Sequence, residues 1–300
     1  MTSTHSTSRL RRPSAVRRLR TGDHTLTHVP DGSVQLRPRQ WFPGTGESDW
    51  VQHAAHLDTD GCLVGSIGGL LIEFGNRAML IDAGFGPRRL APGDSHPALG
   101  LLEGGRLPAE LTALGVSPSR IERIAFTHLH DDHRGWAPPP GSGQPPTFPR
   151  AALLAGREEW RSAGVPGTAL ATATAAPDAV VPGRPYAVEP GEEIFPGVTT
   201  VPLPGHTTGH TGYLISSGDT RVLAFGDVMH STIQLAHPDW HVLFDADAEQ
   251  AVRTRHRVLE MLGESDTIGF GNHFADVVFG RLVSAPTEDT PRWEAAPTDP

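Results

Sequence analysis

Apolar runs separated by turn residues dominate the first half of the chain. The runs at 63–74 and 78–84 are joined by the turn-like tripeptide at 75–77. An apolar run bounded by turn residues is typical of a buried strand. The pattern therefore predicts a hairpin whose second strand ends at Asp82, followed by a Gly- and Pro-rich loop over 85–105.

The next stretches alternate between helix and strand patterns. At 107–114, Pro108 suits the first helical turn, and Gly115 suits the position after the last turn. A strand pattern at 120–126 then leads directly into a group of histidines. The later patterns predict short strands at 187–190, 198–205, 212–217, 221–227 and 266–274 and a helix at 247–262. Several strands end on His or Asp, and α/β enzymes place chemistry in this way, because rigid strands deliver side chains to one rim.

The two ends of the chain differ from this patterned middle. Residues 1–22 hold six Arg and no acid, and no apolar run follows them as a secretory signal would require. We expect a disordered tail there and another over 284–300, which is rich in Pro, Thr and acids. The patterned part, 23–283, is predicted to be one domain with loop insertions near 85–105, 135–149 and 164–185.

The charge of the patterned part limits the kinds of partner. The whole chain carries −9, and the +6 of the first 22 residues leaves −15 for residues 23–300. Because nucleic-acid binding needs a basic surface, we exclude that class of partner. No apolar run reaches the roughly 18 residues of a membrane-spanning helix, so we expect no membrane partner. The single cysteine, Cys62, permits no internal disulfide, which is consistent with a cytoplasmic protein.

A cluster of three histidines and two aspartates lies at 128–133, with the spacing HxHxDH. Neutral imidazole is the commonest side-chain metal ligand, and a carboxylate beside it suits a divalent ion. In an extended segment, residues two apart point the same way, so His128 and His130 can converge on one ion. Asp132 and His133 would lie in the turn just beyond. The cluster therefore predicts a metal site.

Three further residues resemble metal ligands, and each follows a strand pattern. His206 lies in the segment PGHTTGH, Asp227 ends RVLAFGD, and His273 ends IGFGNH. With the cluster at 128–133 they give a set of five His and two Asp.

The motifs HxHxDH, GHTxGH, GD and a late His, in this order, resemble those of the metallo-β-lactamase-fold hydrolase superfamily. The strand end LIDAG at 80–84 also matches, and the resemblance covers roughly residues 60–275. It implies an α/β fold, an αββα sandwich in which two mixed sheets pack face to face. Helices would lie outside the sheets, and the metals would lie at one edge.

The resemblance also implies a role for each candidate ligand. His128, His130 and His206 would bind a first ion, whereas Asp132, His133 and His273 would bind a second. Asp227 would bridge the two ions. Asp82 would support the ligand loops from behind. Apart from the resemblance, we interpret His210, four residues after His206, as a supporting or structural residue rather than a ligand.

The carboxylate at the bridging position indicates which branch of the superfamily the chain resembles. True metallo-β-lactamases generally lack a bridging carboxylate, whereas lactonases, glyoxalase-II-like thioesterases and organophosphate hydrolases of this fold have one. Asp227 therefore disfavours antibiotic hydrolysis. The segment 226–240, together with WFPG near residue 41, resembles most the quorum-quenching-lactonase and methyl-parathion-hydrolase-like branch.

These features predict a hydrolase with two divalent ions, for which we expect Zn²⁺, with iron or manganese as alternatives. Two such ions about 3.5–4 Å apart can hold a bridging hydroxide that attacks a lactone or related ester carbonyl. The resemblance suggests Asp132 as the proton shuttle. A thioesterase or a phosphotriesterase is an alternative on the same centre. An iron-dependent oxygenase or dioxygenase of this fold is an alternative of another class.

The substrate pocket is less well defined by the sequence. We expect a small-molecule substrate and leave a homodimer open. Arg134 stands where relatives are commonly apolar, so it could bind an acidic substrate, pair with an acid or point to solvent. The candidate pocket residues are Trp41, Phe42, Arg134, Trp136, His230 and Trp240.

Overall fold

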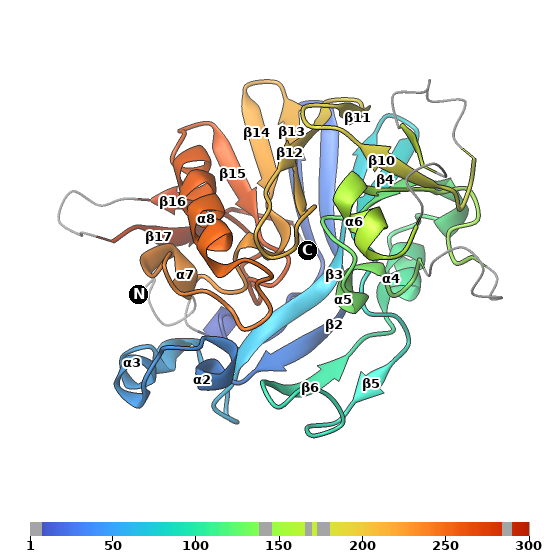
Figure 1. Cartoon of the computed structure of the whole chain (residues 1–300). Helices are drawn as coiled ribbons and strands as arrows, with labels where there is room; N and C mark the ends of the chain where they lie inside the picture. Colours follow the sequence, from blue (N-terminus) through green and yellow to red (C-terminus); the bar gives the residue numbers. More distant parts are fainter. Residues whose placement is uncertain (1–7, 138–145, 166–169, 173–180, 284–289, 300) are drawn as a thin grey trace.

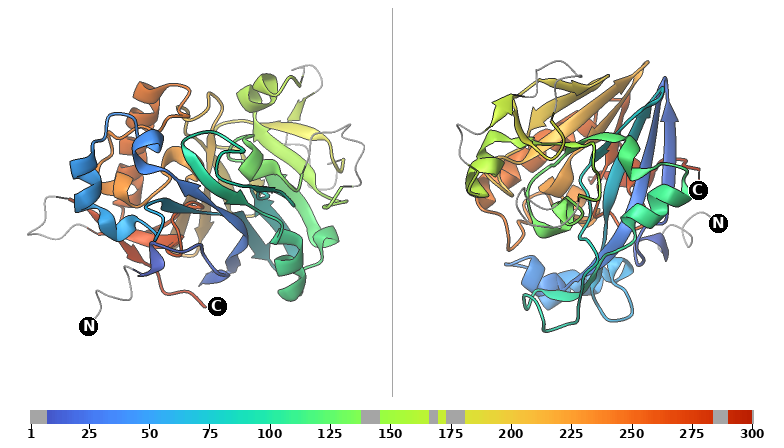
Figure 2. Two further views of the ribbon diagram at one scale, coloured as in Figure 1. Left: turned by 90° about the horizontal axis from the view of Figure 1, so that it is seen from below. Right: turned by 90° about the vertical axis from the view of Figure 1, so that its right-hand side faces the viewer.

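Two mixed β-sheets pack face to face at the centre of the protein, and helices cover both outer sides (Figure 1). The computed structural model describes residues 8–137, 146–165, 170–172, 181–283 and 290–299. Figure 2 shows the same layers from two further directions. This arrangement confirms the predicted αββα sandwich of the α/β class.

The first sheet has ten strands and is built around a long antiparallel pair, β2 (His24–Leu36) and β3 (Leu63–Phe74). β3 continues into β4 (Arg77–Ile81) through the predicted hairpin. β4 pairs in parallel with β7 (Ile121–Ala125), after the connecting helix α4 (Leu107–Ala113). The strand order is β5-β6-β2-β3-β4-β7-β8-β10-β9, and β1 (Arg17–Thr21) lies outside this order and pairs with β2. The remaining strands of the sheet are β5 (Arg89–Leu90), β6 (Leu99–Glu103), β8 (Ala152–Gly156), β9 (Ala171–Thr172) and β10 (Pro185–Val188).

The second sheet has seven strands in the order β11 to β17. β14 (Thr220–Ala224) and β15 (Thr267–Phe270) run in parallel, and α8 (Ala248–Leu262) lies between them in the chain. The other neighbours in this sheet are antiparallel: β11 (Glu193–Phe195), β12 (Val198–Pro202), β13 (Thr211–Ser217), β16 (Phe279–Val283) and β17 (Arg292–Ala295).

The packing follows the alternation of apolar side chains along the strands. A core of buried residues, including Ile72, Tyr213 and Val222, fills the space between the two sheets. On the outer side of the first sheet, α4 and α6 (Arg157–Ser162) bury apolar side chains such as Trp160. α8 buries Val258 and Leu262 against the second sheet. Burial of apolar side chains in three places therefore stabilises the sandwich: between the two sheets, and between each sheet and the helices outside it.

A cap lies over one end of the first sheet. It consists of α2 (Pro38–Trp41), α3 (Glu47–Gln52) and the short helix η1 (Ala54–His56). Its aromatic residues pack with the end of β2 and with the region after α7 (Ile233–Ala236). Within the described ranges, no helix is long and apolar enough to span a membrane.

The carboxyl ends of the two parallel strand pairs lie at the same edge of the sandwich. β4 leads to Asp82 and β7 leads to His128 in the first sheet. In the second sheet, β14 is followed by the turn η5 (Gly226–Val228), which holds Asp227, and β15 is followed by His273. Residues from four distant parts of the chain therefore meet at one rim.

The structure corrects the expected disordered tail over 1–22. Arg17–Thr21 forms β1, which pairs antiparallel with the start of β2. The side chains of Arg9, Arg12 and Arg17 all contact the buried carboxylate of Asp276. Composition alone indicates disorder because it cannot reveal a partner about 260 residues away. Residues 1–7 lie outside the described part.

Other predicted loops and tails also contain structure. The segment 85–105 includes β5 and β6, and the expected tail over 284–300 includes β17, which pairs with β16. The insertions at 135–149 and 164–185 fall largely on residues outside the described ranges. The limits of one domain over 23–283 stay a prediction.

Candidate metal centre

Three imidazoles converge at the rim to form the first group of donors. His128 and His130 follow β7, and His206 lies in the turn after β12. His128 Nε2 is 2.9 Å from His130 Nδ1, and His206 Nε2 is 3.1 Å from the same His130 atom. His128 and His206 are buried, whereas His130 is exposed. The three nitrogen atoms can therefore serve one ion.

The second group combines two imidazoles with a carboxylate. Asp132 and His133 lie on the short helix α5 (Asp131–Arg134), and His273 follows β15. Asp132 Oδ2 is 3.7 Å from His133 Nε2 and 3.6 Å from His273 Nε2. His133 and His273 are buried, and Asp132 is the member of this group that is open to solvent.

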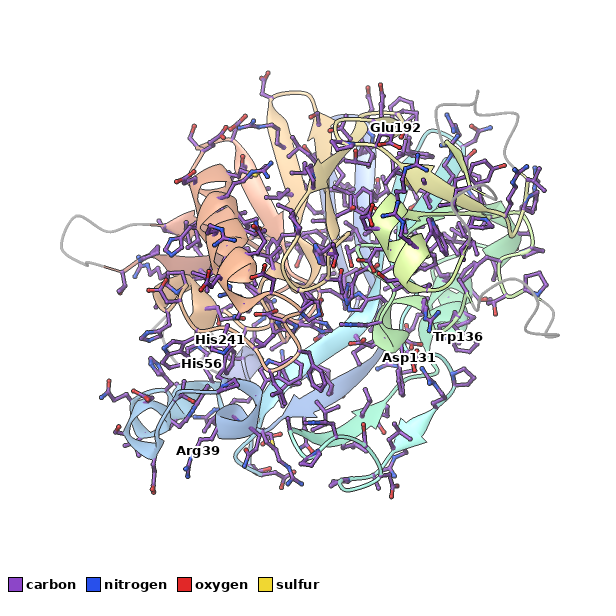
Figure 3. All side chains as sticks on the ribbon, in the orientation of Figure 1. Arg39, His56, Asp131, Trp136, Glu192 and His241 are labelled. Carbon is purple, nitrogen blue, oxygen red and sulfur yellow. The ribbon has the colours of Figure 1, made fainter. Side chains whose placement is uncertain are left out.

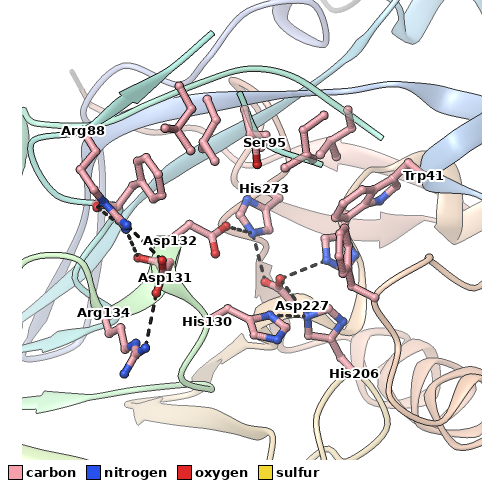
Figure 4. Close-up of a pocket in the computed structure, with 18 of the residues that line it drawn as sticks. Trp41, Arg88, Ser95, His130, Asp131, Asp132, Arg134, His206, Asp227 and His273 are labelled. Carbon is pink, nitrogen blue, oxygen red and sulfur yellow. Dashed lines mark hydrogen bonds and ion pairs between the residues drawn. The ribbon is translucent and has the colours of Figure 1, made fainter. Parts of the chain in front are cut away.

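Asp227 lies between the two groups, and its two oxygen atoms face different ones (Figure 4). Oδ1 is 3.3 Å from His133 Nε2 and 3.1 Å from His273 Nε2. Oδ2 is 3.5 Å from His206 Nε2 and 3.8 Å from His128 Nε2. A carboxylate in this position can bridge two ions.

The charges and unpaired atoms of this group fit metal ions. Burial lowers the pKa of His128 well below its ordinary value. Although part of the His130 side chain is exposed, its ring is desolvated where Nδ1 faces His128 and His206, and this, with His206 nearby, lowers the pKa of His130 to about 4. Both imidazoles are therefore neutral, which is the form that binds metal. His133 Nε2 and Asp227 Oδ1 are buried and make no hydrogen bond. Because unpaired buried polar atoms are costly, ions at this point would satisfy them.

The carboxylates of the centre favour charge on the other two histidines. Burial disfavours the charged form of His133, but Asp227 and Asp82 outweigh it, so its pKa lies well above the usual value. For His273, burial is outweighed in the same way by Asp227, and its pKa is raised. Burial opposes ionisation of Asp227, yet His273 and His133 hold its pKa well below the usual range. Ions and protons would therefore compete for these imidazoles.

Hydrogen bonds to the far nitrogen atoms orient three of the candidate ligands. His133 Nδ1 is 2.9 Å from Asp82 Oδ2, and His206 Nδ1 is 3.0 Å from Asp245 Oδ1. His273 Nδ1 is 2.7 Å from the carbonyl oxygen of Ser66. An acceptor on one ring nitrogen keeps the proton there and turns the lone pair of the other toward the centre.

The structure places both expected supporting residues beside the centre. Asp82 has a positive φ of 61° and accepts a 2.8 Å hydrogen bond from the Thr127 backbone N–H, next to His128. His210 Nε2 accepts a 3.0 Å hydrogen bond from the backbone N–H of Asp227. His210 therefore holds the Asp227 turn and is not in either donor group.

Sequence reasoning missed other supports of the same loops. Glu159 on α6 accepts backbone hydrogen bonds from Leu129 at 3.2 Å and Gly209 at 3.0 Å, which ties two ligand loops together. The buried Arg255 on α8 donates a 2.9 Å hydrogen bond to the Val228 carbonyl oxygen. Neither residue belongs to a recognisable motif. Their role in holding these loops is evident only from the structure, where each charged side chain is buried next to a loop that carries candidate ligands.

His230, which the sequence suggests as a pocket residue, also contacts the candidate metal centre directly. Its Nε2 is 3.0 Å from Asp227 Oδ2, and its ring stacks on that of His273 with centroids 5.5 Å apart. Gln234 Oε1 accepts a 2.7 Å hydrogen bond from the His230 backbone N–H. His230 therefore supports the carboxylate that lies between the two donor groups.

A cavity of about 410 Å³ opens onto the centre. One wall is apolar and is formed by Val34, Leu36, Leu90, Leu99 and Leu102. A charged rim faces this wall, and there Asp131 pairs with Arg88 at 3.0 Å and with Arg134 at 3.4 Å (Figure 4). Of the three options for Arg134, the structure selects pairing with an acid.

The other pocket candidates divide into two kinds. Trp41 and His230 line the cavity. Phe42 and Trp240 instead pack in the cap, where Phe42 stacks on Trp50 and Trp240 stacks on His237. Trp136 donates a 2.7 Å hydrogen bond to the Asp31 carboxylate. Phe42, Trp136 and Trp240 are therefore corrected from pocket to packing residues, because their aromatic surface is used by neighbouring side chains.

Known proteins provide an independent comparison. A probable metallo-hydrolase of Mycobacterium tuberculosis is 31% identical over 181 residues, which are 54% of this chain and 56% of the relative. An N-acyl homoserine lactonase of Bacillus cereus is 28% identical over 174 residues, which are 58% of this chain and 64% of that protein. The chain thus spans little more than half the length of the curated relatives that it matches.

Solved structures with the same fold cover more of the chain. The dizinc quorum-quenching lactonase AidC, solved with a product bound, superposes with a TM-score of 0.75 at 20% identity, over 95% of this chain and 98% of AidC. At this identity the superposition establishes the fold alone. The model of the metallo-beta-lactamase superfamily matches residues 69–263, more than half of the sequence. The resemblance found in the motifs is thereby confirmed, and the chain belongs to the metallo-beta-lactamase superfamily.

Proposed function

We propose that the protein is a dinuclear metal-dependent hydrolase of a lactone or a related ester. The observation that carries this proposal is the position of Asp227, whose two oxygen atoms face two separate groups of donors. A single-ion site would need only one of these groups. The similarity to an N-acyl homoserine lactonase supports the same substrate class.

The donor set favours Zn²⁺, since five imidazoles and two carboxylates suit borderline divalent ions. His128, His130 and His206 would hold one ion, and Asp132, His133 and His273 the other, with Asp227 shared. Two such ions would supply an activated water at neutral pH and a Lewis acid for the substrate carbonyl.

Asp132 would handle the proton of the reaction. Its side chain is 26% exposed and lines the cavity, whereas Asp227 is almost completely buried. A carboxylate that faces both the centre and the cavity can receive a proton during attack on the carbonyl carbon. It can then return the proton to the leaving oxygen when the ring opens.

The apolar wall would bind the hydrocarbon part of the substrate. Val34, Leu36 and Leu99 belong to this wall, and Ser95 is a polar residue that also lines the cavity. Burying an alkyl chain there gains about 0.8 kcal/mol per CH₂ group. We therefore expect lactones with an aliphatic substituent to be better substrates than unsubstituted lactones.

The decisive experiment combines metal quantification with a substrate panel of lactones, thioesters, phosphotriesters and β-lactams. We expect a colourless zinc protein that opens lactones without O₂, and an Asp227→Ala variant that loses activity and metal. The matched control is His256→Ala, because His256 is an exposed residue on α8 that pairs with Asp239. A coloured iron protein whose turnover consumes O₂ would replace the proposal with an oxygenase, and preferred cleavage of phosphotriesters or thioesters would replace the substrate class.

A further inference from the structure

A second group of imidazoles lies where the cap meets the residue after α7. His53 follows α3, His56 ends η1, and His237 follows α7. His53 Nε2 and His237 Nε2 are 2.9 Å apart, although the two residues are 184 positions apart in the sequence. We propose that His53 and His237 bind a third metal ion, of the late first-row transition series, outside the dinuclear centre.

The distance between the two nitrogen atoms supports binding of one metal ion by both imidazoles. Two imidazoles on one tetrahedral ion, each about 2.0–2.1 Å from it, have their nitrogen atoms roughly 3.3 Å apart. At the dinuclear centre, the corresponding distances from His130 to His128 and to His206 are 2.9 and 3.1 Å. The nitrogen atoms of His53 and His237 are thus as close to each other as those of the first donor group.

Burial and neighbouring imidazoles favour the neutral form of His53 and His56. His53 and His56 have ring centroids 6.0 Å apart and line one cavity of about 300 Å³ (Figure 3 labels His56). Burial and the neighbouring His53 lower the pKa of His56 to about 4, and burial with His237 nearby lowers the pKa of His53. His56 Nδ1 is buried without a hydrogen-bond partner. The lone pairs of His53 and His56 are therefore available near neutral pH, and the cavity that both line has room for water to complete the coordination.

The donor type identifies the class of ion. Imidazole nitrogen binds Zn²⁺, Ni²⁺ and Cu²⁺ well, whereas Mg²⁺ and Ca²⁺ prefer oxygen. An ion on this pair would join the cap to α7. Because α7 carries Gln234, which binds the backbone of His230, the ion would also brace the segment beside the cavity. The expected consequence is a more stable cap.

The site can be tested with Ni²⁺ on the full-length protein after loading with zinc. We expect one additional Ni²⁺ per chain, with zinc retained, by calorimetry and by metal quantification after gel filtration. The ring of Trp240 stacks on His237 with centroids 4.2 Å apart, so bound Ni²⁺ should quench tryptophan fluorescence. Ni²⁺ should also raise the denaturation midpoint.

Two variants separate an ion site from a simple hydrogen bond between imidazoles. His53→Gln and His237→Ala should each weaken Ni²⁺ binding at least tenfold and remove the quenching, with lactone hydrolysis retained. The control is His96→Ala, an exposed residue outside both groups of histidines. The proposal is overturned if the zinc-loaded protein takes up no Ni²⁺, or if both folded variants take it up as the parent does. Because the readout is an extra ion, failure here leaves the dinuclear proposal intact.

Discussion

Two aspartates, Asp227 and Asp276, are both almost completely buried but have different kinds of charged partner. Asp227 is 3% exposed and is surrounded by imidazoles from four parts of the chain. Asp276 is 1% exposed and is surrounded by guanidinium groups. Arg12 Nη2 lies 2.7 Å from Asp276 Oδ2, and Arg17 Nη2 lies 2.6 Å from Asp276 Oδ1.

The difference between the partners decides what each cluster can do. A guanidinium group is charged at every accessible pH, so it neutralises a buried carboxylate by itself. Imidazoles are neutral near pH 7 unless a carboxylate holds a proton on them. The Asp276 cluster is therefore complete as it stands and serves as a structural lock. The Asp227 cluster is instead neutralised either by protons held on His133 and His273 or by cations, which suits a metal centre.

The Asp276 cluster also contacts the segment that carries one of the candidate ligands, His273. Asp276 lies three residues after His273, and Ala275, between them, has a positive φ of 44°. Ser66 Oγ bonds the Ala275 carbonyl oxygen at 2.8 Å and accepts the Ser14 backbone N–H at 2.7 Å. The carbonyl oxygen of the same Ser66 is the partner of His273 Nδ1. The segment around Ser14, through Ser66, thus helps to position His273 of the second donor group.

Metal removal should produce the largest contrast between the two clusters. Chelation should abolish lactone hydrolysis, by more than about 10³-fold, because both the nucleophile and the Lewis acid would be lost. Activity should return with added Zn²⁺, as measured by stopped assays before and after dialysis. The Asp276 cluster should stay intact throughout, seen as unchanged far-UV circular dichroism. Full activity in a metal-free sample would contradict the metal role of Asp227.

Asp276→Asn should lower the free energy of unfolding by about 3 kcal/mol, because three guanidinium groups would lose their buried partner. Urea denaturation measures the change. The matched control is Asp131→Asn, since Asp131 also pairs with two arginines but has a side chain 58% exposed. That variant should change the free energy of unfolding by less than about 1 kcal/mol. Equal changes in the free energy of unfolding would show that the buried Asp276 cluster contributes no more than the exposed ion pairs of Asp131.

Asp245→Asn should weaken metal binding by roughly 10–100-fold, since Asp245 orients His206 through its far nitrogen. Competition with a chromophoric chelator measures the affinity. Asp239→Asn is the control, because Asp239 bonds the exposed His256, which is in neither donor group. An unchanged affinity in Asp245→Asn would show that the Asp245 carboxylate has no part in the centre.

Lowering the pH should reduce the contribution of the Asp276 cluster to the stability of the protein. Burial opposes ionisation of Asp276, but hydrogen bonds from Arg17 and Arg12 outweigh it, so its pKa lies below the usual value. Its contribution to stability is present above the unfolded-state pKa of about 3.9 and is lost as the pH falls below it. The difference in unfolding free energy between the parent and Asp276→Asn should therefore shrink between pH 5 and pH 3. A constant difference would mean that Asp276 is not ionised in the folded protein.

The sequence predicts the parts of the structure that depend on neighbouring residues. The hairpin at 63–84 and the helix at 247–262 follow from apolar patterns and turn residues, and both are present as β3–β4 and α8. The motif HxHxDH marks the donors that follow β7 and those on α5, because their spacing is local. The predicted strand end at Asp227 is instead the short turn η5.

Long-range partners explain what the sequence does not reveal. β2 passes through Pro30, Asp31 and Gly32, which resemble a turn, but the strand continues through a bulge at that point. The buried Asp31 carboxylate then accepts backbone hydrogen bonds from Phe85 at 2.8 Å and Leu107 at 2.9 Å. Asp245 and Asp276 act on the centre in the same way, through partners that no local pattern marks.

The most direct test of the central claim is a crystal structure with anomalous diffraction measured at the zinc edge. We predict two anomalous peaks about 3.5–4 Å apart. One should lie among His128, His130 and His206, the other among Asp132, His133 and His273, with Asp227 between them. A single peak, or a pair in which Asp227 contacts only one ion, would contradict the account.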